Sequence, residues 1–443
     1  MDCRIQELLS TRRFGELKQL LSRMNEVDIA EQLDSLSQKE LLLVFRLLPK
    51  ETAADTFSYM ESDVQQSLIS AMDDVELRAV LDELALDDTV DMLEEMPASV
   101  VKRVLQNCDM QYRASINQFL RYPEDSAGSL MTIEYVDLKG KMTAAEAFEH
   151  IRATGIDKET IYTCYVTDKN RLLCGVVTVK DLLLAKSESR VEELMERNVI
   201  SVRTLDDREQ IALLFGRYDF LSLPVVDNEN RLVGIITVDD AIDALQEENT
   251  EDFEKMAALA PGDESYLKTP VLQHAKRRII WLLVLMLSAA VTGTMITHYQ
   301  NSFAVLPLLV AFIPMLMDTG GNCGSQSSTL IIRGMALDEL HPRDLGRILW
   351  KEIRVALLVG SALAVVNSMR ILLQYHNPLL ALTIAVTLMC TVCIAKCLGC
   401  ILPITAKRLG ADPAIMASPI ITTLVDACSI FIYFNIAKLI LRV

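Results

Sequence analysis

The run Cys174–Asp181 (CGVVTVKD) is repeated 59 residues later as Val233–Asp240 (VGIITVDD), and this repeat determines how the middle of the chain is interpreted. In each copy a glycine and a run of β-branched residues lead into Thr-Val and an acidic residue, which is typical of a strand passing into a helix. A short run that ends in aspartate precedes each copy, at Val166–Asp168 and Val225–Asp227. Two copies of one pattern predict an internally repeated α/β domain.

Helical runs flank each copy of the repeat. Ala144–Ala153 and Glu209–Tyr218 come before the strands, and Leu182–Ala185 and Ala241–Leu245 come after them. The repeated unit is therefore β-α-β-β-α, and residues 126–245 resemble a tandem pair of CBS motifs, a Bateman module. The resemblance implies a regulatory domain that binds adenosine nucleotides or ions between its halves.

Residues 1–125 predict an all-helical domain, because apolar residues recur at three- and four-residue intervals with little glycine, as in Lys39–Leu48 and Val75–Leu84. Leu48-Pro49, Met72-Asp73 and Met96-Pro97 recur every 24 residues, and each precedes an apolar helix. A fixed repeat of this kind predicts a small superhelical solenoid. The prolines fit first-turn positions, where their missing N–H costs nothing.

The charge is divided unequally along the 443 residues. Residues 1–270 contain 29 Lys and Arg against 53 Asp and Glu, whereas residues 271–443 contain 14 against 7. The acidic front excludes a protein that binds the nucleic-acid backbone, which needs a basic face. The start of the chain has no apolar signal segment, so the ten cysteines are interpreted as reduced thiols.

Residues 271–443 predict a transmembrane domain of five helices, with 246–270 as a connecting helix and linker. Lys and Arg gather before the first apolar segment, between the second and third, and between the fourth and fifth. The positive-inside rule then predicts a multi-pass plasma (inner) membrane protein with a cytoplasmic N-terminus. The five segments are Ile279–Thr297, Phe303–Ile332, Val355–Leu373, Leu379–Leu402 and Ala414–Leu441.

Asp426 lies in the middle of the last apolar segment, where a carboxylate costs roughly 2.5–3.5 kcal/mol on insertion scales. We therefore expect it to face a water-filled path or a partner. Pro413 and Pro419 near the start of this segment, and the polar run Asp318–Ser327 in the second segment, predict two interrupted helices that line a cation pathway. The alternative is a polar interface between packed helices, where Gly, Ser and Thr are also common.

The chain also resembles the MgtE family of magnesium channels. The resemblance covers nearly the full length and rests on Met131–Tyr135, Thr319–Asn322, Gln326–Leu330, and Asp412–Ala414 with Pro419 and Asp426. It implies a homodimer with one pore on the dimer axis, an aspartate at Asp426 that holds hydrated Mg²⁺, and closure of the pore by cytosolic Mg²⁺.

The resemblance also assigns residues one by one. In the pore these are Asp426, Asn322, Thr319 and Pro419, and the preference of Mg²⁺ for oxygen ligands adds the carbonyl oxygen of Thr422, one turn before Asp426. The implied regulatory Mg²⁺ ligands are Asp87 and Asp91 in the helical domain, Asp207, Glu209, Asp219, Asp240 and Asp243 in the CBS pair, and Glu248, Glu251 and Asp252 on the connecting helix Ala241–Leu259.

Three residues depart from the family pattern, and one of them is Ser418, which stands before Pro419 where an Asn is usual in some members. Asp318 stands where a small neutral residue is expected, and Lys396 places a cation in the fourth apolar segment. We hypothesise that these two side chains pair with each other away from the axis. Cys390, Cys393, Cys397 and Cys400 have a spacing that favours helix packing, since one straight helix cannot bring four cysteines to one ion.

The chemistry favours Mg²⁺, because the predicted ligands are oxygen atoms and histidines are scarce. A broader divalent-cation transporter for Co²⁺ or Mn²⁺ stays open. The rival interpretation is a membrane-anchored, nucleotide-sensing CBS protein, with ATP bound near Lys180, Asp181 and Phe220. ATP as a modulator of the channel is compatible with both. No catalytic motif is present, so we expect no enzyme.

Overall fold

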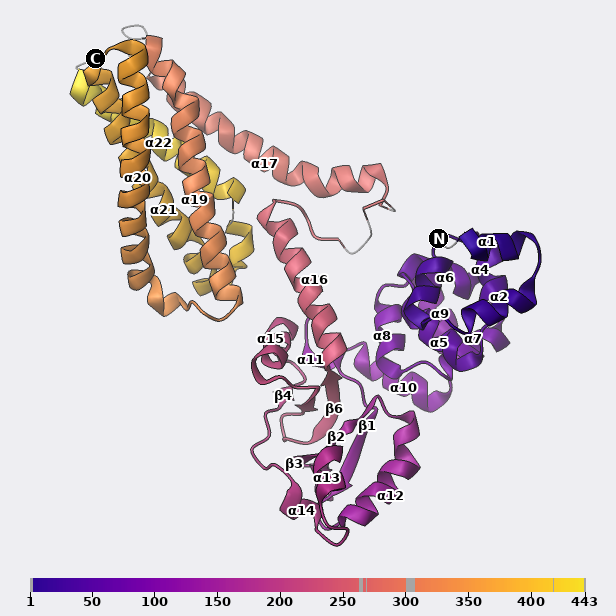
Figure 1. Cartoon of the computed structure of the whole chain (residues 1–443). Coiled ribbons are helices and arrows are strands. Elements are labelled where there is room, and N and C mark those ends of the chain that lie inside the picture. Colours follow the sequence, from indigo (N-terminus) through magenta and orange to yellow (C-terminus); the bar gives the residue numbers. More distant parts are fainter. Residues whose placement is uncertain (1–2, 263–265, 268, 300–306, 417, 442–443) are drawn as a thin grey trace. The chain divides into compact units, whose positions relative to one another are not determined.

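The computed structural model describes residues 3–262, 266–267, 269–299, 307–416 and 418–441. It divides into two compact units, Met1–Leu245 and Gln246–Val443 (Figure 1). The first unit contains a helical domain followed by two small β-sheets, and the second is helical throughout its described residues.

Ten short helices form the N-terminal domain. Pro49, Asp73 and Pro97 are the N-cap residues of α5, α7 and α9, so the 24-residue repeat marks every second helix start. The apolar face of each helix packs into a shared core that extends to the second β-sheet. The helices are α1 Cys3–Ser10, α2 Phe14–Leu21, α3 Glu26–Leu33, α4 Gln38–Phe45, α5 Lys50–Ser58, α6 Ser62–Ala71, α7 Asp74–Leu81, α8 Leu86–Glu94, α9 Ala98–Asn107 and α10 Met110–Phe119.

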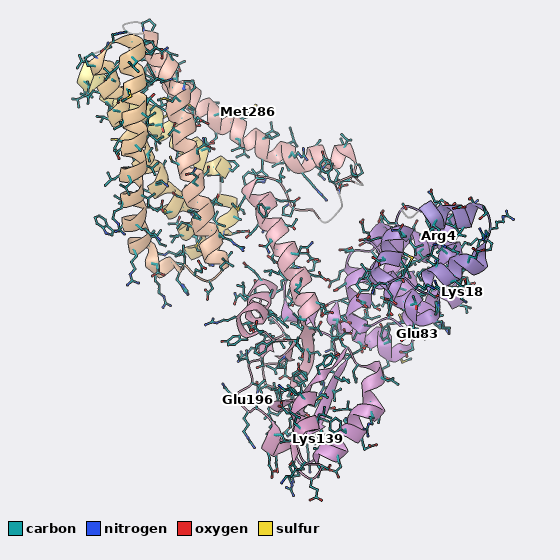
Figure 2. The ribbon with its side chains drawn as sticks, in the orientation of Figure 1. Arg4, Lys18, Glu83, Lys139, Glu196 and Met286 are labelled. Carbon is teal, nitrogen blue, oxygen red and sulfur yellow. The ribbon has the colours of Figure 1, made fainter. Side chains whose placement is uncertain are left out.

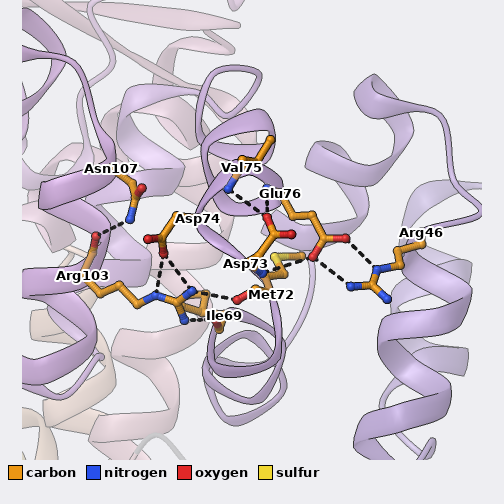
Figure 3. Close-up of polar contacts among 9 residues, drawn as sticks. All are labelled: Arg46, Ile69, Met72, Asp73, Asp74, Val75, Glu76, Arg103 and Asn107. Carbon is orange, nitrogen blue, oxygen red and sulfur yellow. Dashed lines mark hydrogen bonds and ion pairs between the residues drawn. The ribbon is translucent and has the colours of Figure 1, made fainter.

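Arginine side chains link neighbouring helices of this domain by hydrogen bonds to groups at helix ends (Figure 3). Arg103 on α9 donates to the carbonyl oxygens of Ile69 (2.6 Å) and Met72 (2.7 Å), which no residue of α6 itself could satisfy at its C-terminus. Arg46 after α4 donates to Glu76 on α7 at 2.6 Å. The solenoid is thus held by polar contacts at its surface as well as by its core.

The repeat folds as predicted into two equivalent three-stranded sheets, ordered β1-β2-β3 and β4-β5-β6. In each sheet the first strand is parallel to the second and the third is antiparallel to it. The strands are β1 Tyr135–Lys139, β2 Thr160–Thr167, β3 Leu173–Thr178, β4 Val202–Arg203, β5 Ser222–Val226 and β6 Leu232–Thr237. The helices are α11 Ala127–Leu130, α12 Ala144–Thr154, the 3₁₀ turn η1 Gly155–Asp157, α13 Val179–Leu184, α14 Val191–Leu194 and α15 Arg208–Tyr218.

The glycine in each repeated run is explained by the segment that crosses it. A Cβ on Gly234 would lie 2.8 Å from the carbonyl oxygen of Thr132, and one on Gly175 would lie 2.9 Å from that of Glu196. Both crossing segments form β-bridges with the residue after the glycine. The two sheets also meet through a buried hydrogen bond of 2.7 Å between Tyr165 Oη and Ser222 Oγ.

Helix α16 (Val238–Met256) begins directly after β6 and contributes to both units. The second unit then contains five helices of 24 residues or more among its described residues. Most apolar side chains of α17, including Met286, are exposed (Figure 2), whereas about half of the residues of α19 and of α21 are buried. The long helices are α17 Val271–His298, α19 Ile313–Ala336, α20 Leu345–Tyr375, α21 Pro378–Arg408 and α22 Ser418–Leu441, and the 3₁₀ turns are η2 Pro307–Phe312, η3 Pro342–Asp344 and η4 Pro413–Met416.

Four of these five helices are long and apolar enough to cross a membrane in the described residues. The exception is α19, which carries the polar run. The prediction that this run interrupts its helix is wrong, because α19 is continuous from Ile313 to Ala336. Pro314 lies in the first turn, where it is tolerated, and the glycines permit close packing instead of breaking the helix.

Candidate functional site

Helix α19 has one buried face and one exposed polar face. Gly320, Gly321 and Gly324 are buried, whereas Asp318, Asn322 and Gln326 recur at four-residue intervals and are exposed. The Asn322 amide donates to Asp318 Oδ1 at 3.2 Å, and Thr319 is half-buried beside them. In a helix of a membrane domain, such an exposed polar stripe is costly unless it faces water or another polar surface.

The glycines bring α19 into contact with α22, which carries Asp426. A Cβ on Gly321 would lie 3.1 Å from the Thr422 methyl group, and one on Gly324 would lie 2.6 Å from the Ile421 side chain. Asp426 is half-buried one turn beyond Thr422. The structure therefore brings Thr422 and Asp426 beside the helix that carries Thr319 and Asn322.

Pro419 occupies the first turn of α22, so it removes no intrahelical hydrogen bond. Its carbonyl oxygen accepts hydrogen bonds of 3.0 Å from the hydroxyl groups of both Thr422 and Thr423. These bonds use the hydroxyl hydrogens and leave the lone pairs of the hydroxyl oxygens available. The side-chain oxygen atoms that this part of α22 offers to an ion are thus those of Thr422, Thr423 and Asp426.

The hypothesised pair of Asp318 and Lys396 is wrong. Lys396 lies on α21 and contacts Glu352 of α20 at 3.3 Å and Ser327 of α19 at 3.1 Å. Asp318 instead binds Asn322 on its own helix. Nothing in the sequence indicated that Glu352, on a third helix, is the partner of Lys396. The four cysteines on α21 are half-buried or buried free thiols, as expected for packing positions.

The connecting helix α16 makes polar contacts within the second unit. Lys255 bridges Glu251 of α16 and Asp412, which precedes η4, at 2.7 Å to each carboxylate. Asp252 lies beside this bridge, and desolvation together with repulsion from Asp412 raises its pKa to about 6. Glu248 lies one turn before Asp252, and Asn249 accepts a hydrogen bond from Arg333 at the end of α19. An excess of carboxylates thus surrounds one ammonium group here.

A second acidic cluster lies in the first unit, where α8 meets the start of α16. Asp87 is 8% exposed, and burial followed by repulsion from Asp88 raises its pKa to about 7. Desolvation and then Asp87 raise the pKa of Asp240 to about 7, although its Oδ2 accepts a hydrogen bond from Thr237. Desolvation and repulsion from Asp240 raise the pKa of Glu159, at the start of β2, to about 7. The four carboxylates repel one another across two domains.

Asp91 belongs to the same cluster, one turn after Asp87. Desolvation and then repulsion from Asp87 and Asp240 raise its pKa to about 8. Its side chain is exposed on the surface of α8. Asp88, Asp91 and Asp240 are thus accessible to a cation that would neutralise them.

The cluster fits a hydrated divalent cation better than a fully ligated one. Asp87 Oδ1 is buried and has no hydrogen-bond partner, which is an unusual cost for a protein interior. Among the described residues, however, the group Asp34, Glu61 and Asp63, which is exposed, is the only set of three or more possible ligands whose atoms lie within 4.8 Å of one another. Mg²⁺ keeps several of its waters, so wider spacing suits it.

The other predicted ligands of the CBS pair are not gathered in one place. Asp207 is the N-cap of α15 and accepts from the backbone N–H of Glu209 at 3.0 Å, whereas Asp219 is at the opposite end of that helix with φ +54°. Asp243 lies one turn beyond Asp240 on α16, and desolvation and Asp239 raise its pKa. Asp207 and Glu209 therefore cannot share an ion with Asp219 inside one chain.

The candidate nucleotide residues lie at equivalent ends of the two CBS halves. Asp181 accepts from the Thr178 hydroxyl at 2.5 Å in a capping box at the start of α13, and Lys180 precedes it. Phe220 stacks on Tyr218 with ring centroids 5.4 Å apart. An aromatic pair and an exposed capping carboxylate are groups that could bind a base and a ribose.

Three acidic residues of these clusters were missed by the sequence interpretation: Asp88, Glu159 and Asp412. Asp88 follows Asp87 directly, so doubled aspartates at a helix start were an available signal. Glu159 had no such signal, and Asp412 was named only as part of the motif Asp412–Ala414, without a role. Only the tertiary fold brings them to the predicted residues.

Known family models match three parts of the chain. A family model described as "MgtE intracellular N domain" matches residues 24–125, and CBS domains match 127–188 and 191–247. A model described as "Divalent cation transporter" matches residues 313–436, which include the polar stripe and Asp426. The predicted order of helical domain, CBS pair and helical C-terminal region is thereby confirmed.

Individual relatives extend along the same length. The chain is 37% identical over 442 residues to the magnesium transporter MgtE of Thermus thermophilus, covering 99% of this chain and 98% of that protein. It is 31% identical over 422 residues to the magnesium transporter MgtE of Bacillus subtilis, covering 93% of each.

Two solved structures each match a little over half of the chain. The cytosolic domain of the Mg²⁺ channel MgtE in complex with ATP aligns with a TM-score of 0.52 and 39% identity, covering 54% of this chain and 98% of that one. The soluble part of a magnesium transporter aligns with a TM-score of 0.52 and 28% identity, covering 55% and 96%. The chain therefore belongs to the MgtE family of divalent cation transporters.

Proposed function

We propose that this chain forms a Mg²⁺-selective channel of the plasma membrane, closed by Mg²⁺ that binds its acidic cytosolic domains. One observation carries the proposal: an exposed polar stripe on α19, formed by Asp318, Asn322 and Gln326, beside the helix that carries Asp426. The full-length match to two magnesium transporters supports Mg²⁺ as the ion.

The membrane arrangement in this proposal has five spans and a cytoplasmic N-terminus. The spans are the four apolar helices together with α19, which is the second along the chain. Helix α19 is less apolar than the other four because one of its faces lines water. Its 24 residues rise by about 36 Å at 1.5 Å per residue, enough to cross the hydrocarbon. The basic loops remain on the cytoplasmic side.

The proposed pore lies between two copies of the chain. The exposed stripe of α19 needs a polar surface or water opposite it, and a twofold axis supplies a second stripe. Asp426 from each copy, with the carbonyl oxygens near Thr422, then forms a ring of oxygen ligands. Such a ring is wide enough to hold Mg²⁺ with its waters, which the ion sheds reluctantly.

Regulation follows from the acidic cluster of Asp87, Asp88, Asp91, Glu159 and Asp240. At low Mg²⁺ these carboxylates repel, with about 4 kcal/mol between two charges 4 Å apart at an effective dielectric of 20. A divalent cation replaces the repulsion with attraction and draws α8 toward the start of α16. Because α16 continues to Lys255 and Asp412, the same helix carries this change to the membrane domain.

The decisive experiment is Mg²⁺ flux into liposomes that contain the purified chain, with Mg²⁺ varied separately on the two sides. Asp426→Asn is expected to abolish flux while the dimer persists in cross-linking. Glu339→Gln, a charge-neutralising control on an exposed residue after α19, is expected to conduct normally. Normal flux through the Asp426→Asn variant would remove the pore assignment. Repeating the measurement with Co²⁺ and Mn²⁺ determines whether the selectivity is broader.

ATP is the second proposed ligand, as a modulator of the channel. The support is the ATP complex of a similar cytosolic domain, which is 39% identical to this chain. Here the phosphate and ribose would lie near Lys180 and Asp181, and the base near Phe220. Titration of the full chain with a fluorescent ATP analogue tests this, and equal affinity in the Asp181→Ala variant would contradict it.

A further inference from the structure

A buried ion pair joins three helices of the second unit. Lys396 on α21 is 5% exposed, and its ammonium lies 3.3 Å from Glu352 Oε2 on α20 and 3.1 Å from Ser327 Oγ on α19. The Ser327 hydroxyl donates to the same Glu352 oxygen at 2.8 Å. The side chains of Lys396 and Glu352 are 6% and 14% exposed, so water shields neither charge well.

The pair lies against the helix that carries the polar stripe. A Cβ on Gly320 would lie 2.7 Å from the Thr391 methyl group, and one on Gly399 would lie 2.3 Å from the Gly324 carbonyl oxygen. Lys396 lies between Thr391 and Gly399 on this contact face of α21. Ser327 is five residues from Asn322, which is about 7.5 Å along the α19 axis.

The positive charge of an ammonium group at that position repels a cation in the proposed pathway. A unit charge buried about 10 Å from a divalent ion is poorly screened, and the resulting repulsion is large enough to lower occupancy at least tenfold. The carboxylate of Glu352 at 3.3 Å converts the monopole into a short dipole, whose field falls off far more steeply with distance. The effect on a cation in the pathway then depends on the net charge of the pair of Lys396 and Glu352.

We propose that Glu352 is a charge-compensating residue of the ion pathway, which cancels the field of Lys396 so that a buried cation can fasten α19, α20 and α21 without repelling Mg²⁺. This inference rests on the proposed channel function. It assigns Glu352 no contact with the ion. Glu352 acts through Lys396.

A purely mechanical fastening makes a different prediction. If the pair served only to hold helices, Glu352→Gln and Lys396→Met would each break it and lower flux and thermal stability alike. Charge compensation instead predicts opposite signs. An unpaired Lys396 ammonium repels the permeating cation, whereas an unpaired Glu352 carboxylate attracts it.

The test measures initial Mg²⁺ flux of the full chain in liposomes at subsaturating Mg²⁺, normalised to protein that elutes as a folded species. Glu352→Gln is expected to lower flux at least tenfold, and Lys396→Met to raise it. The double variant E352Q/K396M, which is neutral, is expected to return within about twofold of wild type, because removing both charges restores the field. Glu339→Gln, which neutralises an exposed carboxylate outside the ion pair, serves as the control and is expected to conduct as wild type does.

Two results would overturn the inference while leaving the channel intact: equal losses of flux in both single variants, or wild-type flux in Glu352→Gln. If a single variant fails to fold, the double variant still decides, because a flux below one tenth of wild type in a folded neutral variant contradicts the compensation. Flux through Asp426→Asn equal to wild type would instead refute the proposed pore.

Discussion

Neutralising Asp87 is expected to stabilise the first unit and to remove much of its response to Mg²⁺. The native pKa of Asp87 is about 7 against an ordinary value of 3.8, with burial as the main cause. At 1.36 kcal/mol per pKa unit, this one ionisation costs the folded state about 4 kcal/mol at pH 8 in the absence of a cation.

The sign of the pH dependence follows from the direction of the shift. Between pH 3.8 and 7 the folded state binds the Asp87 proton more tightly than the unfolded state does, so stability falls as the pH rises through this window. Asp91 and Asp240 have raised pKa values too, and they add to the same trend. Mg²⁺ is expected to restore the lost stability above pH 7.

The assay is thermal unfolding of the Met1–Leu245 unit from pH 5 to 8, in EDTA and in Mg²⁺. The melting temperature of wild type is expected to fall as the pH rises to 8 in EDTA and to recover when Mg²⁺ is present. The Asp87→Asn variant is expected to melt roughly 5–10 °C above wild type at pH 8 in EDTA, since about 1 kcal/mol corresponds to 2–4 °C at this size and a buried amide offsets part of the gain. Asp28→Asn, on the exposed face of α3, is the control. An unchanged pH slope and an unchanged Mg²⁺ increment in Asp87→Asn would refute the reasoning.

Three further changes have defined outcomes. Gly399→Ala places a Cβ 2.3 Å from a backbone oxygen of α19 and is expected to destabilise the membrane domain by more than about 3 kcal/mol; size-exclusion thermostability should show this, and Gly346→Ala, with open space around it, should melt as wild type does. Lys255→Met removes the bridge between Glu251 and Asp412, so the Mg²⁺ concentration that halves the flux is expected to rise several-fold. Lys255→Arg retains the bridge and should behave as wild type does. Identical curves of flux against Mg²⁺ for the two variants would exclude a role for the bridge. Asp207→Ala removes the N-cap of α15 and should cost about 1 kcal/mol in urea unfolding of the first unit, so an unchanged midpoint would contradict the capping role.

The sequence predicted those parts of the fold whose cause is local. The 24-residue period of the N-terminal domain reflects the capping of every second helix, and Pro49 and Pro97 show it directly. The Gly in each copy of the α/β repeat was visible as a pattern. Its reason was not, because the carbonyl oxygens that approach Gly175 and Gly234 come from segments 21 and 102 residues away.

Predictions that depended on helix-to-helix distance were less successful. Lys396 was assigned to Asp318, since both were visibly out of place in apolar segments, but Glu352 on a third helix is its partner. The Gly-rich run was predicted to break α19, because Gly weakens an isolated helix. Close packing against α21 and α22 overrides that propensity. Both errors arise from contacts between residues far apart in the chain.

Helix α16 emerges from β6 without an intervening loop and runs for 19 residues, about 28 Å. It therefore behaves as a lever: a 10° swing at its base displaces its far end by roughly 5 Å, about one helical turn. A movement of that size exceeds the reach of any single ion pair, so the contact between Lys255 and Asp412 would have to break. In the proposed mechanism, such a lever would convert a small rearrangement among the carboxylates at its base into a larger displacement at its far end.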